Sequence, residues 1–214
     1  MSESLITGMI LAAVGGFLDA YTYLCRGGVF ANAQTGNIVL LGIKASQGDI
    51  RGALRYAVPI VSFMLGIVLA QAVRGKFKGS GRIHWRQVVL AFETAILAVV
   101  SFLPQSTFGN MLANVLVSFV CSLQVQSFRK INGKVIATTM CTGNLRSATE
   151  HLCNYAAGKD KAQLRHALEY GGIIVLFIAG AVLGALAAGA LGAVSALAAC
   201  AGLAAAFILM LRAQ

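Results

Sequence analysis

The tripeptide Thr-Gly-Asn occurs twice in the 214-residue chain, at Thr35–Gly36–Asn37 and at Thr142–Gly143–Asn144. Thr can cap a helix with its hydroxyl, Gly permits an unusual turn or a close backbone approach, and Asn caps helices and tolerates left-handed dihedrals. Such a tripeptide suits the start of a half-helix, whose N-terminus presents partial positive charge to a polar or anionic solute. We predict that these six residues frame a substrate-binding site; a simple helix cap at an interhelical turn is the structural alternative.

Asp19 lies inside a long apolar stretch. A charge in a membrane span costs a few kcal/mol unless it faces protein or water. Asp19 and Tyr23 border a stripe of small residues that suits close helix contact, formed by Gly8, Ala12, Gly16 and Ala20. We therefore expect Asp19 to point into the bundle as a coupling or orienting carboxylate, with Tyr23 as a further candidate. The structural alternative is an Asp bonded to neighbouring backbone or Tyr hydroxyl groups.

Two other polar residues occur in apolar runs. Gln124 lies late in one such run and is expected to line a cavity with the site. Glu93 is the sixth residue of the run that starts at Val88. It is either a proton-coupling carboxylate or the partner of Arg82 or Arg86 toward the inner surface, and the sequence favours the ion pair.

Arg146 follows the second tripeptide closely, where it would add to an anion-attracting field; Glu150, four residues later, suits an ion pair with it. His84, His151 and His166 are too scattered for a metal-ligand set, and five cysteines without a CxxC pair are typical of small buried hydrophobes. The chain contains no His-Glu-x-x-His motif, and we recognise neither a serine with a base nor paired aspartates. The sequence therefore predicts no metal, no cofactor and no enzyme activity.

The elements that must position these residues are membrane helices. The chain is 58% hydrophobic and 11% charged, with a mean hydropathy of +0.79, whereas soluble domains carry about a quarter charged residues. An N-terminal stretch without a basic region and with Asp19 argues against a cleaved signal peptide. Six apolar runs approach the roughly 20 residues that a span needs: Leu5–Leu24, Gly52–Val73, Val88–Leu103, Phe108–Phe128, Leu168–Leu191 and Gly192–Leu211. The last two abut, which predicts a tight turn near Gly189–Gly192.

The two tripeptides are 107 residues apart, half the chain length. The segment "LRYAVPIVSFMLGIVLA" also matches "LEYGGIIVLFIAGAVLG", with Leu, Tyr, Phe and Gly at corresponding places. Self-similarity between the two halves of a chain indicates duplication. We predict one membrane domain built from two repeats, residues 1–107 and 108–214.

The direction of the repeats depends on whether the two Thr-Gly-Asn segments cross the membrane. Lys and Arg accumulate in cytoplasmic loops. Six spans with two dipping segments put 13 basic residues inside and four outside, whereas eight spans give nine against seven. We therefore predict an all-α integral membrane protein with six transmembrane helices, two re-entrant half-helices, two inverted three-span repeats and cytoplasmic termini. The four outside cations are Arg26, Lys44, Arg51 and Arg55.

The stretches "GGFLDAYTYL" and "VFANAQTGNIVLLG" closely resemble the opening of the YoaK-type bacterial membrane proteins, a family of unknown function with about six predicted spans. The resemblance covers essentially the whole chain. The later segment "SLQVQSFRK" keeps Gln124 and Arg129 but has Ser122 and Val125 where the family has Gly and Asn. The resemblance implies a bacterial inner-membrane location and no particular activity.

These patterns favour a transporter or permease for a small polar or anionic solute. A passive small-solute channel and a non-transporting accessory or lipid-binding membrane protein are the alternatives. The expected partners are the solute and the lipid bilayer. Exposed small-residue faces would permit a homodimer, and the net charge of +10 is assigned to orienting loops rather than to nucleic acid.

Overall fold

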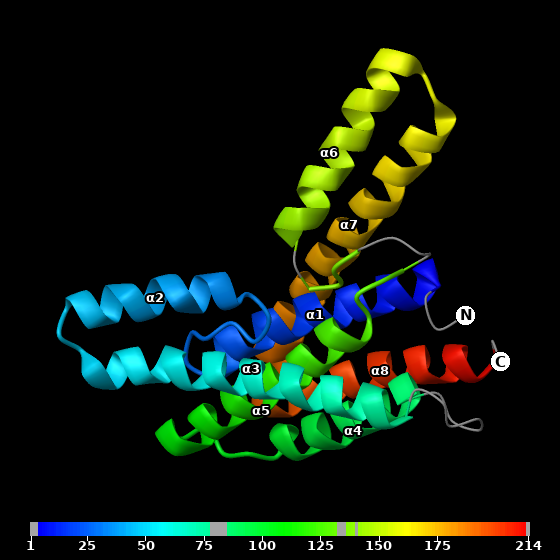
Figure 1. Cartoon of the computed structure of the whole chain (residues 1–214). Coiled ribbons are helices and arrows are strands. Elements are labelled where there is room, and N and C mark those ends of the chain that lie inside the picture. The colour runs from blue at the N-terminus through cyan, green and yellow to red at the C-terminus, as the bar shows by residue number, and fades with distance from the viewer. Residues whose placement is uncertain (1–3, 78–84, 132–135, 140, 213–214) are drawn as a thin grey trace.

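The computed structural model describes residues 4–77, 85–131, 136–139 and 141–212, which fold into helices joined by short connections (Figure 1). In chain order the elements are α1 (Leu5–Cys25), α2 (Gln34–Ser46), α3 (Ile50–Phe77), α4 (Trp85–Ser101), α5 (Thr107–Ser127), α6 (Cys141–Gly158), α7 (Lys161–Leu191), the 3-10 turn η1 (Gly192–Ser195) and α8 (Ala196–Arg212).

Corresponding helices of the two sequence halves begin with the same type of residue. Ser4 before α1 and Ser106 before α5 each accept a hydrogen bond from the backbone N–H three residues later, at 3.2 and 3.1 Å. Before α3, Asp49 accepts from the N–H three residues later at 2.8 Å, and before α7, Asp160 accepts from the N–H two residues later at 2.9 Å. Such side chains satisfy backbone donors that a helix start leaves free.

Among the described residues, four stretches are long and apolar enough to cross a membrane: Leu5–Cys25, Ile50–Gly75, Thr107–Ser127 and the 51-residue stretch Lys161–Leu211. The last stretch contains α7, η1 and α8, and it turns at Gly192, whose φ is 58°. The turn predicted near Gly189–Gly192 is confirmed, as is the all-α membrane class. The helix α4 has 17 residues and α2 has 13. At 1.5 Å per residue α2 is about 20 Å long, shorter than the ~30 Å hydrocarbon core.

The outward faces of α3 and α7 are apolar, which suits contact with lipid chains. Their exposed side chains include Val61, Met64, Leu65 and Val68 on α3, and Val175, Ile178, Val182, Leu183 and Leu186 on α7. Conversely, many polar side chains of α1, α4 and α5 are buried.

The helices contact one another in corresponding pairs. α1 packs on α7 as α5 packs on α3, α1 touches α8 as α5 touches α4, and α2 and α6 each pack on the helix that follows. α1 and α5 run antiparallel (Figure 1). Gln124, late in α5, donates to the carbonyl of Leu11, early in α1, at 3.1 Å; Asn114 donates to the carbonyl of Arg26 at 2.7 Å.

Glycines permit the closest helix contacts. A Cβ at Gly16 of α1 would collide with the Phe177 carbonyl of α7, and one at Gly180 of α7 with the Ala13 carbonyl of α1. Gly66 of α3 likewise faces the Phe119 carbonyl of α5. Gly66 and Gly180 occupy the same place in the two matching segments. The small-residue contact predicted for α1 is confirmed at Gly16.

Candidate functional site

Asn37 and Asn144 anchor the first turns of α2 and α6 in the same way. The Asn37 side chain accepts from the backbone N–H of Phe30 at 3.1 Å and donates to its carbonyl at 2.6 Å. Asn144 makes both bonds with Ala137, at 3.3 and 2.6 Å. Both amides are buried. Each Asn therefore fixes the loop that precedes its helix by bonding the residue seven positions earlier.

The other members of the tripeptides do not act as predicted. Thr35 and Thr142 are the second residues of α2 and α6, and both are exposed. The N-cap of α2 is Ala33, without a side-chain bond, so the predicted threonine caps are wrong. Gly36 lies in the helix, where a Cβ would come within 3.0 Å of the Phe30 ring. Gly143 has open space around it, and neither glycine has a positive φ.

Asp19 is buried and points into the bundle. Its Oδ1 accepts from the backbone N–H of Asn32 at 2.7 Å and of Ala33, the N-cap of α2, at 3.4 Å. A carboxylate at this place complements the positive end of α2. Asp19 therefore makes the bonds to backbone groups that were expected if its role is structural. Tyr23 is 47% exposed and stacks on Phe30 with the ring centres 4.8 Å apart, so it does not share the interior with Asp19.

Gln124 bonds the loop before α6, as Asp19 bonds the loop before α2. Its amide donates to the Leu11 carbonyl on α1 and to Thr138 Oγ1, at 3.3 Å, in the loop before α6. The side chain is buried. Asp19 thus joins α1 to the loop before α2, and Gln124 joins α5 to the loop before α6.

The two loops meet on α1 at Gly15. The Asn32 amide nitrogen donates to the Gly15 carbonyl at 3.0 Å. From the other half, Thr139 Cγ2 lies 3.2 Å from the position that a Cβ on Gly15 would take. Asn32 and Thr139 are themselves 107 residues apart. We call this meeting point, formed by Gly15, Asn32 and Thr139, the Gly15 junction.

Two residues of the Gly15 junction carry buried oxygen atoms without a partner, and other such atoms occur on α4 and α5. Among the described residues, no hydrogen bond reaches Asn32 Oδ1 or Thr139 Oγ1. The same holds for Ser118 Oγ on α5 and for both carboxyl oxygens of Glu93 on α4. Cys121, one turn after Ser118, lies beside the Asn32 side chain and within electrostatic reach of Asp19 and Glu93. We call these five oxygen atoms the unpaired set.

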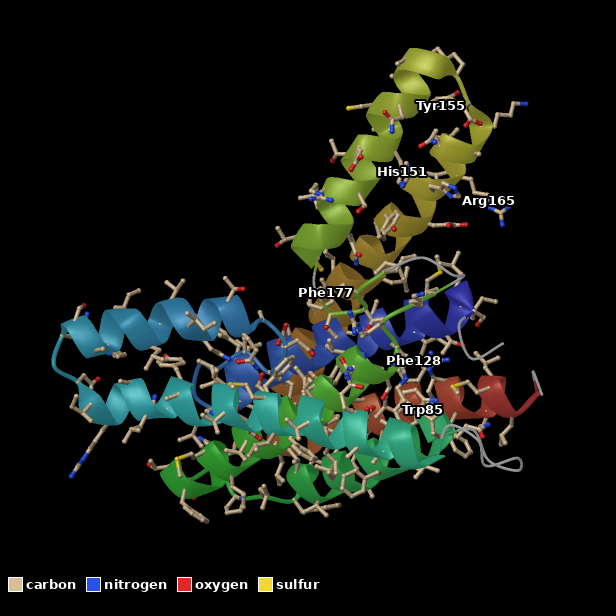
Figure 2. All side chains as sticks on the ribbon, in the orientation of Figure 1. Trp85, Phe128, His151, Tyr155, Arg165 and Phe177 are labelled. Atoms are coloured by element: carbon tan, nitrogen blue, oxygen red, sulfur yellow. The ribbon has the colours of Figure 1, made fainter. Side chains whose placement is uncertain are left out.

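The predicted ion pair of Glu93 with Arg86 is wrong. Glu93 is 0% exposed, and no ion pair or hydrogen bond joins its carboxyl group to any described side chain. Arg86 donates to the Ser127 carbonyl at 2.7 Å, and its guanidinium lies 5.4 Å from the Trp85 ring centre and 5.7 Å from that of Phe128. Figure 2 shows these two rings near one end of the bundle. Arg82 lies outside the described residues.

Arg146 is exposed on α6, and in the described part of the chain no ion pair joins it to Glu150. It belongs to the α6–α7 hairpin, which projects from the other helices and also carries His151, Tyr155 and Arg165 (Figure 2). His151 Nδ1 lies 2.7 Å from Gln163 Oε1. No group of three or more His, Cys, Asp or Glu side chains suited to a metal ion occurs in the described residues.

Sequence reasoning placed Arg26, Lys44, Arg51 and Arg55 outside but did not group them. All four line one cavity of about 850 Å³, called here the basic cavity. Asn114 also lines it. The sequence did contain a signal for this grouping. These four residues are the cations that the charge count places on the outer side, which is otherwise poor in Lys and Arg.

Apolar outward faces around a buried polar cluster define a multi-span membrane protein. The chain belongs to the family described as "Protein of unknown function (DUF1275)", whose model matches residues 7–210. It is similar to the UPF0700 transmembrane protein YoaK of Bacillus subtilis (strain 168), with 28% identity over 186 residues that cover 83% of this chain and 81% of the relative. No solved structure matches. The predicted YoaK-type resemblance is confirmed.

Proposed function

We propose that the protein is a transporter for a small polar or anionic solute, with its substrate site at the Gly15 junction. The observation that supports this most strongly is the unpaired set, because its five buried oxygens come from both sequence halves and two of them belong to Asn32 and Thr139 at the Gly15 junction. The hydroxyls of Thr139 and Ser118 can donate, whereas Asn32 Oδ1 can only accept. This combination suits a solute that carries donors as well as acceptors.

The energetic cost of the unpaired set favours a functional role. Each buried polar group without a partner costs about 1–3 kcal/mol, and a buried unpaired carboxylate costs more. Apolar residues of similar size would remove that cost. Residues kept at the expense of stability are typical of sites that bind something else.

We infer that the two halves are inverted three-span repeats with re-entrant α2 and α6. The antiparallel bonds between α1 and α5, the shortness of α2 and the corresponding helix contacts support this arrangement. Both half-helix starts then face a common centre, as in transporters built from inverted repeats. Rocking of one half against the other would expose the Gly15 junction to each side in turn.

A counterflow assay in proteoliposomes tests the proposal. Vesicles are preloaded with a millimolar solute and receive a radioactive tracer of the same solute, with inorganic phosphate, succinate, glutamate and serine tried in turn. We expect transient tracer accumulation for at least one of them. Thr139→Val should lower its rate about fivefold to tenfold, the equivalent of one hydrogen bond of about 1 kcal/mol.

Thr149→Val is the matched control. Thr149 is exposed on α6 and bonds only its own helix, at the Leu145 carbonyl, so the same substitution there should leave the rate unchanged. Flux that rises linearly with concentration and shows no counterflow would replace the carrier by the passive channel. Absence of flux for all four solutes would overturn transport of these classes and favour an accessory role.

A further inference from the structure

The basic cavity lies at the end of the bundle that contains the α2–α3 turn and the α4–α5 loop. Its lining includes four cations, Arg26, Lys44, Arg51 and Arg55, and one acid, Asp49. The other polar lining residues are Tyr56, Gln105, Thr107, Asn110 and Asn114. The lining therefore carries an excess of three positive charges.

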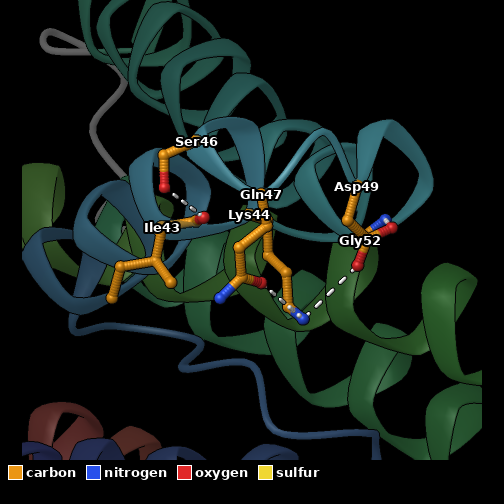
Figure 3. Close-up of polar contacts among 6 residues, drawn as sticks. All are labelled: Ile43, Lys44, Ser46, Gln47, Asp49 and Gly52. Atoms are coloured by element: carbon orange, nitrogen blue, oxygen red, sulfur yellow. Dashed lines mark hydrogen bonds and ion pairs between the residues drawn. The ribbon is translucent and has the colours of Figure 1, made fainter.

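Asp49 forms its ion pair with Lys44 and lies within electrostatic reach of Arg55. Lys44 Nζ lies 3.3 Å from Asp49 Oδ2 and 3.4 Å from Gln47 Oε1, in the turn that Figure 3 shows. Asp49 Oδ1 accepts from the Gly52 N–H. This backbone bond and then Lys44 lower the pKa of the Asp49 carboxyl group. Asp49 is thus a fixed anion committed to the turn.

None of the three arginines forms an ion pair with a described residue. Arg51 and Arg55 are exposed, and no ion pair or hydrogen bond joins either side chain to a described residue. Arg26 is 0% exposed and donates to the carbonyls of Val100 and Leu103, at 2.9 and 3.1 Å. These groups are dipoles rather than charges, so the three guanidinium groups give the cavity a net positive field.

Asn114 connects the basic cavity with the interior. It is 1% exposed, and among the described residues its Oδ1 has no partner. Ser118 and Cys121 follow at four and seven residues, so the three side chains share one face of α5. Cys121 lies beside the Asn32 side chain of the Gly15 junction and within electrostatic reach of Glu93, so this face of α5 connects the basic cavity with the junction.

We propose that the basic cavity binds a small anion through a carboxylate or phosphate group and is the vestibule from which that anion reaches the Gly15 junction. Guanidinium forks match the geometry of both groups. The vestibule role rests on the proposed transport function and narrows its solute to an anion. Anion binding itself requires only the cavity.

Isothermal titration of the full chain in phosphatidylcholine nanodiscs, with inorganic phosphate and with succinate, tests the proposal. We expect saturable binding of at least one probe. The double variant Arg51→Gln/Arg55→Gln should weaken it at least tenfold, since both side chains are exposed and carry no structural bonds. Arg129→Gln, an exposed arginine just beyond the other end of α5, should change it less than twofold. Equal loss in the double variant and in Arg129→Gln, or no binding at millimolar probe, would overturn the site.

Lipid headgroups also carry phosphate groups. A second nanodisc composition distinguishes binding of a free anion from binding of a headgroup. Replacing a quarter of the lipid by phosphatidylglycerol should leave probe binding unchanged, apart from the general repulsion of anions by a negatively charged membrane surface. Complete competition would assign the cavity to a headgroup and overturn the vestibule. Thr139→Val separates this proposal from the transport proposal, because it should reduce flux and leave binding in the basic cavity intact.

Discussion

Asn37 and Asn144, 107 residues apart, hold the same pair of hydrogen bonds to the residue seven positions earlier. Each bond satisfies a backbone group within the protein, and an unpaired group there costs about 1–3 kcal/mol. We expect Asn37→Ala and Asn144→Ala each to lower the free energy of unfolding by about 2 kcal/mol. Asn154→Ala, on the exposed face of α6, should change it by less than about 0.5 kcal/mol. Denaturant titration in detergent measures all three, and a harmless Asn37→Ala would show that these bonds do not hold the loop.

Arg26 serves the fold as well as the charge of the basic cavity. Its guanidinium donates to the Val100 carbonyl in the last turn of α4, to the Leu103 carbonyl in the loop after it and to the Tyr21 hydroxyl, the last at 2.8 Å. Lysine has a charge but not the planar fork, so we expect Arg26→Lys to cost on the order of 2–3 kcal/mol, the value of a charged hydrogen bond left unmade. Thermal unfolding compared with Arg51→Lys, which loses no bond, checks this. Equal melting temperatures for the two variants would contradict it.

Substitution of Glu93 or Thr139, unlike substitution of Arg26, should not lower the free energy of unfolding. Their side-chain oxygens have no hydrogen-bond partner in the described residues, so Glu93→Gln and Thr139→Val remove no bond. We expect unfolding free energies equal to or above the wild-type value for both variants, with reduced counterflow. Loss of stability by more than about 1 kcal/mol in Thr139→Val would indicate a structural bond at Oγ1 and would remove the main support for the substrate site.

The charge of the basic cavity should be constant between pH 5 and pH 8. An ordinary Asp has a pKa of about 3.9, and that of Asp49 is lowered by the Gly52 N–H and Lys44. A lowered pKa means that the stability contributed by the turn is present above the unfolded-state value and is lost only as pH falls through the folded value. Sulfate, a permanent dianion in this range, should therefore bind with the same affinity from pH 5 to pH 8.

Asp49→Asn imitates the protonated state of Asp49. It frees Lys44 and should tighten sulfate binding at pH 7 relative to the wild type, as titration calorimetry can measure. An affinity that changes between pH 5 and pH 8 would show that another group controls the cavity, and weaker binding in Asp49→Asn would show that the turn matters more than its charge.

The fold was more predictable from the sequence than the site. Apolar length and duplication depend on local pattern, so the helices and the turn at Gly192 followed from them. The prediction of threonine caps was wrong because an Asn side chain fixes the start of α2 and of α6. Each Asn bonds the backbone of the residue seven positions earlier, a spacing that neither the helical nor the strand period suggests. The pairing of Glu93 was wrong because Arg86 turns toward Ser127 and two aromatic rings. The basic cavity joins Arg26, Lys44 and Arg55 from three separate elements, which only the tertiary fold brings together.

Inverted repeats require the two halves of the chain to face opposite sides of the membrane, which site-directed labelling can show. In a chain freed of its five native cysteines, Ala45→Cys marks the end of α2 and Ala157→Cys the end of α6; both alanines are exposed. A membrane-impermeant maleimide applied to intact cells should label only Ala45→Cys, and Ala157→Cys should react only after permeabilisation. Labelling of both positions from the same side would mean parallel halves and would contradict the account.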